Sequence, residues 1–109
     1  MDQKAAILAY YDSFRTRDRG ALERLLVPDF RHRSPFGEYD DRDRMLDEIW
    51  PAVGGSWAID IEIYGEGPDF MVRYRHNVEG SGTMAEYVRF EGGRIAEIEV
   101  YLGSLPQRP

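Results

Sequence analysis

Apolar side chains in the first part of the chain recur at helical spacing. An amphipathic helix is predicted over residues 3–17, where four aromatic or aliphatic residues fall on one stripe: Ile7, Tyr10, Tyr11 and Phe14. Asp18 is expected to cap a short second helix. That helix must end before Pro28, because the proline ring blocks continuation.

A third helix is predicted after a short extended segment. Residues 30–35 read as this extended segment, and residues 35–37 (Pro-Phe-Gly) read as a turn. Asp41 or Asp43 is expected to cap the third helix, which Pro51 ends. No further helix is predicted beyond this point.

The second half of the chain changes to a period of two, which is typical of strands. Apolar residues alternate with polar ones in the first of these strands: Trp57, Ile59, Ile61 and Ile63. Further strands are predicted over residues 70–78 and 83–90. A last strand carries Ile98, Val100 and Leu102 on its apolar face. Glycine-containing turns separate the strands, so the sheet is predicted to be an antiparallel meander.

Composition limits the classes of protein to which the chain can belong. The 109 residues fit one domain, residues 1–109, with a loose tail at 104–109. A net charge of −6 opposes binding to nucleic-acid phosphates. The absence of cysteine excludes disulfides and thiolate chemistry. No signal peptide and no apolar run long enough for a membrane span is present, so we expect a cytoplasmic protein without membrane contact.

Strand alternation places several polar side chains on the apolar face of the predicted sheet. Glu86 must share a face with Met84 and Val88, which makes it a carboxylate among apolar neighbours. The same parity turns His32 and His76, the two histidines of the chain, inward. A pocket on this face is the expected site.

The order of these elements resembles the nuclear transport factor 2-like superfamily, and within it the SnoaL-like (polyketide-cyclase-like) and ketosteroid-isomerase-like branch. The supporting segments are residues 10–18, residues 25–30, the turn at 34–37 and the closing hairpin at 90–98. The resemblance covers essentially the whole chain. It implies an α+β fold, a cone-shaped barrel in which three N-terminal helices pack in a curved sheet around one pocket.

The resemblance also suggests roles for individual residues. Tyr10 and Glu86 fall where ketosteroid-isomerase-like proteins carry the two groups that stabilise an oxyanion. Ser34 falls where that family carries its proton-abstracting carboxylate, so steroid isomerisation by the family mechanism is not expected. His32, two residues earlier on the same face, is the candidate replacement base. Other side chains expected to contact a ligand are Ser34, Tyr74, His76, Phe14, Trp50, Val88 and Val100.

Each assignment has a structural alternative. Tyr10 could be a core tyrosine, and His32 could simply be hydrogen-bonded by Ser34 or a tyrosine. Glu86 could pair with an arginine at the pocket rim. Two histidines and a carboxylate would suit iron or zinc, but they lie on separate strands without a spacing signature. We therefore expect neither a metal nor a cofactor.

Two function classes remain open at this stage. One is a cofactor-independent isomerase, cyclase or dehydratase (lyase) acting on a small apolar molecule with a carbonyl or hydroxyl group. The other is a non-catalytic ligand-binding or dimerisation module on the same fold. In either case, a homodimer through the convex face of the sheet is expected, because tyrosines lie there among pairable charges.

Overall fold

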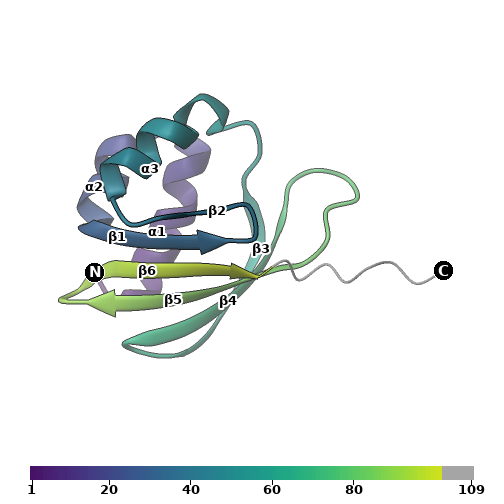
Figure 1. Cartoon of the computed structure of the whole chain (residues 1–109). Coiled ribbons are helices and arrows are strands. Elements are labelled where there is room, and N and C mark those ends of the chain that lie inside the picture. The colour runs from purple at the N-terminus through teal and green to yellow at the C-terminus, as the bar shows by residue number, and fades with distance from the viewer. Residues whose placement is uncertain (102–109) are drawn as a thin grey trace.

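A computed structural model describes residues 1–101 of the chain (Figure 1). The predicted inward position of Leu102 and the predicted tail at 104–109 lie outside these residues. The helices are α1 (Gln3–Thr16), α2 (Arg19–Leu25) and α3 (Arg42–Ile49), followed by the short 3-10 helix η1 (Trp50–Ala52). The strands are β1 (Leu26–Ser34), β2 (Gly37–Tyr39), β3 (Ala58–Glu66), β4 (Asp69–His76), β5 (Met84–Glu91) and β6 (Arg94–Tyr101). None of the described helices is long and apolar enough to cross a membrane.

Aspartate side chains begin all three α-helices. Asp2 accepts a hydrogen bond from the Ala5 amide at 2.7 Å, and Asp18 and Asp41 make the equivalent bonds at the starts of α2 and α3. Such caps satisfy amide groups that have no partner inside the helix. The prediction for Asp18 is confirmed, and of the two candidates for α3 the cap is Asp41.

The six strands form one sheet in the order β2-β1-β6-β5-β4-β3. The predicted antiparallel meander is confirmed for β3 to β6. The sheet as a whole is mixed, because β1 pairs with β6 in parallel. Gly37, predicted as the end of a turn, instead begins the edge strand β2, which pairs with β1. The pairing of β1 with β6 joins strands that are far apart in the sequence. It leaves no local pattern, so alternation alone did not indicate it.

The helices lie together on one face of the sheet and bury its apolar side chains (Figure 1). This α+β arrangement agrees with the predicted fold class. Ile7 from α1, Leu22 from α2 and Leu46 from α3 are fully buried. They pack in one core with sheet residues such as Phe30 and Ile98.

A bulge in β3 corrects one predicted face. Asp60 has a positive φ of 55°, and the register between β3 and β4 shifts between Ile59 and Glu62. Ala58, Ile61 and Ile63 consequently pack against the core in place of a strictly alternating set. An extra residue in one strand reverses the parity of what precedes it.

Candidate functional site

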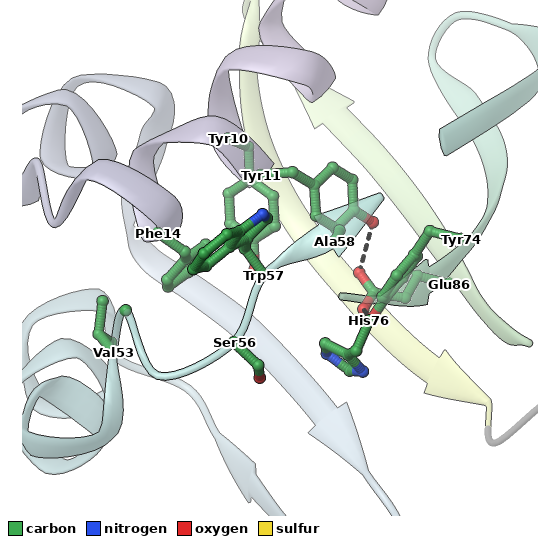
Figure 2. A pocket seen from close by; sticks show the side chains of 11 residues that line it. Tyr10, Tyr11, Phe14, Val53, Ser56, Trp57, Ala58, Tyr74, His76 and Glu86 are labelled. Atoms are coloured by element: carbon green, nitrogen blue, oxygen red, sulfur yellow. Dashed lines mark hydrogen bonds between the residues drawn. The ribbon is translucent and has the colours of Figure 1, made fainter. Parts of the chain in front are cut away.

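A cavity of about 190 Å³ lies between α1, the segment after η1, and strands β3 to β5 (Figure 2). Helix α1 contributes Tyr10, Tyr11 and Phe14 to its wall. Strands β4 and β5 contribute Tyr74, His76 and Glu86. Residues 53–58 complete the wall with Val53, Gly54, Ser56, Trp57 and Ala58.

Glu86 is the buried acid of this cavity, with 5% of its surface exposed. The Tyr11 hydroxyl donates to its Oε1 at 2.7 Å, and the Tyr74 hydroxyl donates to its Oε2. Tyr11 reaches the carboxyl from the helix, whereas Tyr74 lies on the strand beside Glu86 (Figure 2). Both carboxyl oxygens therefore have a phenol partner. We call these three residues the Glu86 cluster.

Burial dominates the acid–base properties of the Glu86 cluster. Desolvation raises the pKa of Glu86 above its usual range, although the hydrogen bonds from Tyr74 and Tyr11 act in the opposite direction. Desolvation and the nearby Glu86 carboxyl raise the pKa values of Tyr11 and Tyr74. The phenols therefore remain protonated, and Glu86 is the group of the cluster that gains or loses a proton.

Aromatic rings make up most of the remaining wall. The Tyr10 ring lies edge-on to Tyr11 and Phe14, with centroids 5.1 Å and 4.9 Å away. The His76 ring lies 5.5 Å from the Tyr74 ring at an interplanar angle of 87°. Such edge-to-face contacts fix ring orientation in an apolar wall. His76 thus places an imidazole beside the Glu86 cluster.

The structure brings Tyr10, Phe14, Tyr74, His76 and Glu86 together at the cavity, as strand parity and helical spacing predicted. The tyrosine that bonds the carboxyl is not Tyr10 but its neighbour Tyr11.

The sequence puts Tyr11 on the helix stripe, but it predicts no role for Tyr11 in the site. The two consecutive tyrosines were the available signal. Neighbouring residues on a helix point about 100° apart, and the apolar face of an amphipathic helix is wide enough to include both.

His32 does not line this cavity. Strand β6 separates β1 from β5, and His32 pairs with Ile98 whereas Glu86 pairs with Val100. Two strand spacings and a two-residue offset place the Cα atoms of His32 and Glu86 about 12 Å apart. Nδ1 of His32 is buried without a hydrogen-bond partner among the described residues, and burial lowers the pKa of its imidazole to about 4.

Ser34 also lies away from the cavity and serves the β1–β2 turn. Its hydroxyl accepts a hydrogen bond from the Phe36 amide at 3.1 Å. This local bond is typical of a serine that stabilises a turn. The predicted pocket therefore contains neither of the two residues that mark the departure from ketosteroid-isomerase-like relatives.

Three further predicted ligand contacts lie outside the cavity wall. Val88 is core, with 1% of its surface exposed, and Val100 stands opposite Glu86 in the β5–β6 ladder. Trp50 lies under two guanidinium groups, those of Arg17 at 5.3 Å and Arg19 at 5.8 Å from its ring centroid. Trp50 is not among the residues that line the cavity, and its ring makes cation–π contacts with these two arginines instead.

The segment after η1 was not predicted as part of the site. Arg17 holds it against the end of α1, donating hydrogen bonds to the carbonyls of Trp50 and Val53. Gly54 packs beside the Arg17 side chain with a φ of +92°, a conformation that favours glycine. Because these contacts join two irregular segments, no periodic pattern indicated them.

The arrangement combines a buried proton donor with an adjacent imidazole in an aromatic cavity. Its volume is slightly larger than an apolar cavity of about 150 Å³ that is known to hold benzene. The cavity can therefore enclose about one ring of a ligand. Within residues 1–101, no group of three His, Asp or Glu side chains is placed to hold a metal ion.

Several solved structures share this fold. An "NTF2-like protein of unknown function" from Cytophaga hutchinsonii aligns with 93% of this chain and 89% of its own, at 18% identity and a TM-score of 0.78. A "putative polyketide cyclase" from Sinorhizobium meliloti aligns over 89% and 94%, at 20% identity and a TM-score of 0.77. A "putative ketosteroid isomerase" from Kribbella flavida aligns over 96% and 80%, at 16% identity and a TM-score of 0.82.

The fold, with its cavity between helix α1 and strands β3 to β5, thus defines an NTF2-like protein. At these identities, the structural likeness establishes the fold alone. The sequence itself matches the family described as SnoaL-like domain over residues 7–98, and the chain belongs to that family. No curated protein matches the sequence.

Proposed function

We propose that the chain is a small-molecule enzyme that performs a cofactor-independent isomerisation, cyclisation or dehydration on an apolar compound with a carbonyl or hydroxyl group. The observation that carries this proposal is the buried Glu86 carboxyl between two phenols in the wall of an aromatic cavity. A carboxyl whose pKa is raised by burial stays protonated to higher pH than a free carboxyl, and it can supply a proton to a ligand oxygen directly or through a bonded tyrosine hydroxyl. The relatives described as a cyclase and an isomerase support this class of chemistry.

His76 is the proposed proton acceptor. It lines the same cavity as Glu86, and its ring stands against Tyr74. His32, the base suggested by the sequence, is the competing assignment, but its low pKa makes it a weak base. Acid and base on one ligand would then act from β5 and β4, with Tyr10, Phe14 and Trp57 as apolar contacts.

The test begins with a thermal-shift screen of one-ring ketones, enones and cyclic alcohols. A ligand at about a hundred times its Kd stabilises the folded state by ~2.7 kcal/mol, which makes a hit easy to recognise. Each hit is then incubated with the protein and examined for isomerised, cyclised or dehydrated product. We expect Glu86→Gln and His76→Gln each to lower kcat/KM by about a hundredfold or more, the usual contribution of general acid–base groups.

His32→Gln serves as the comparison variant and is expected to retain kcat/KM within about tenfold. The opposite ranking, with His32→Gln inactive and His76→Gln active, would return the base to His32. Hits that bind without turnover would favour the alternative function, a non-catalytic binding module. The hydrogen bonds to Glu86 favour this alternative, because each carboxyl oxygen is already bonded to a phenol.

A homodimer through the convex face of the sheet is part of the proposal. Tyr64, Met71 and Tyr101 are 52%, 41% and 46% exposed on this face. Cross-strand pairing puts Tyr64 beside Met71, and Met71 beside Tyr87. Ion pairs such as Arg73–Glu62 and Arg75–Asp60 flank these side chains, which is the pattern of an apolar centre with a polar rim.

Sedimentation of the purified chain tests the dimer. We expect a dimer that Met71→Glu converts to a monomer, because an unpaired charge would be buried at the centre of the interface. Leu8→Glu is the control, since Leu8 is similarly exposed, at 47%, on helix α1. A monomeric wild-type chain would contradict the proposal.

A further inference from the structure

The Glu86 cluster can be described by the number of protons that it shares. The hydroxyls of Tyr11 and Tyr74 bond to different oxygens of the Glu86 carboxyl. Each phenol carries one proton, and an ionised carboxylate carries none. The cluster therefore holds two protons when Glu86 is ionised, and both are used in internal hydrogen bonds.

An acceptor ligand cannot bond to this ionised cluster without cost. It would have to take a phenol proton away from a carboxylate, and hydrogen bonds to an ionised acceptor are about twice as strong as neutral ones. The phenol oxygens of Tyr11 and Tyr74, which both line the cavity, still have lone pairs that can accept hydrogen bonds. The ionised cluster thus accepts hydrogen bonds from a ligand more readily than it donates them.

A third proton turns the cluster from a hydrogen-bond acceptor into a hydrogen-bond donor toward a ligand. Protonated Glu86 donates to one of the two phenol oxygens, and the proton of that phenol becomes free to point into the cavity. Two protons maintain the two internal hydrogen bonds, and one remains for a ligand. The donor to the ligand is then a tyrosine hydroxyl, while Glu86 stays bonded within the cluster.

The surroundings of Glu86 favour the neutral cluster. Its titratable neighbours in the cavity wall are Tyr10 and Tyr11 from α1, and Tyr74 and His76 from β4. No lysine or arginine from residues 1–101 lines the cavity. In the sheet, the ladder partners of Glu86 are the apolar Val72 and Val100. Desolvation accordingly raises the Glu86 pKa.

We infer that a ligand oxygen that can only accept hydrogen bonds, such as that of an uncharged ring ketone, binds only the three-proton form of the Glu86 cluster. Its binding therefore takes up one proton wherever Glu86 is ionised in the free protein. A hydroxyl-bearing ring instead donates to the ionised cluster and requires no proton. This inference rests on the site of the proposed function and adds its ligand class and its pH dependence. It concerns binding and holds whether or not turnover follows.

Two one-ring probes separate these cases: 2-cyclohexenone, which only accepts hydrogen bonds, and phenol, which also donates. Isothermal titration in two buffers of different protonation enthalpy counts the protons taken up, from about pH 5 to about pH 9, where phenol is still protonated. We expect 2-cyclohexenone to take up about one proton above the Glu86 pKa. Its affinity should fall about tenfold per pH unit there, as linkage of one proton requires. Phenol should bind without proton uptake.

Glu86→Gln provides the matched variant, because its amide carries a permanent donor in nearly the same shape. It should bind 2-cyclohexenone without proton uptake and without pH dependence. His76→Gln removes the other titratable group beside the cluster, and proton uptake should persist in it. Carbon-13 NMR of the Glu86 carboxyl adds a direct readout, since ketone binding should shift it to the protonated position.

Three results would each overturn the inference: ketone binding by the wild type without proton uptake at a pH above the Glu86 pKa that the carbon-13 titration gives, uptake that persists in Glu86→Gln, or no 2-cyclohexenone binding at any pH in this range. These results are distinct from a failure of the proposed function. Proton-linked ketone binding without any product would leave the inference intact and remove the enzyme. Turnover accompanied by binding without uptake would do the reverse.

Discussion

The buried imidazole of His32 makes a prediction about acid stability. Its Nδ1 has no partner among the described residues, and burial lowers the pKa of the ring to about 4. An unfolded histidine titrates near ~6.5. Below that pH, the unfolded chain binds a proton that the folded chain does not, so the free energy of unfolding must fall as the pH falls. The loss is complete near the folded pKa of about 4, because below it both states are protonated.

The magnitude follows from these two pKa values. At about pH 5 the linkage amounts to ~2 kcal/mol relative to neutral pH, for an unfolded pKa of ~6.5 and the folded value given above. This is a considerable part of the 5–15 kcal/mol of stability that is typical of a small domain. Because carboxylates also titrate in this range, the quantity to measure is a difference between two proteins.

Urea unfolding of the wild type and of His32→Leu, each at about pH 7.5 and about pH 5, isolates that difference. We expect the wild type to lose ~2 kcal/mol more than His32→Leu between the two pH values. Equal losses in the wild type and in His32→Leu would refute the reasoning, because His32 would then titrate alike in both states.

Two further predictions concern contacts that hold the ends of helices and the segments after them. Gly54→Ala should lower the free energy of unfolding by about 1–3 kcal/mol, because φ is +92° and a Cβ would lie 3.1 Å from Cγ of Arg17; Gly55→Ala, free of both constraints, should cost less in the same urea titration. Arg94→Met should cost about 1.5–3 kcal/mol, because its guanidinium donates to three carbonyls at the end of α2. Arg42 bonds two of these carbonyls, so a double-mutant cycle of Arg42→Met and Arg94→Met should be non-additive, and strict additivity would contradict a shared role.

The fold was largely predictable because its elements carry local signals. The helix starts at Asp18 and Asp41 follow from side-chain capping, and the four-strand meander follows from alternation broken by glycine turns. The parallel pairing of β1 with β6 had no such signal. It joins segments far apart in the chain, with His32 and Ile98 separated by 66 residues, and such partners are selected by the packing of the whole core.

The site was predictable only as far as side-chain parity reaches. Parity states which face a side chain occupies, and it correctly put Tyr74, His76 and Glu86 on one face of neighbouring strands. It does not state which strands are neighbours. His32 shares that face, yet β6 stands between its strand and that of Glu86.

The same distinction changes the chemical reading of the cavity. A histidine about 12 Å away, by strand spacing, cannot exchange a proton directly with a one-ring ligand held at Glu86. The groups within reach are the phenols of Tyr11 and Tyr74 and the imidazole of His76. The departure from a carboxylate at Ser34 therefore does not leave the cavity without titratable groups. The groups that can exchange protons with a ligand are therefore not on β1, as the sequence suggested. They are Glu86 and the two tyrosines that share its protons, together with His76.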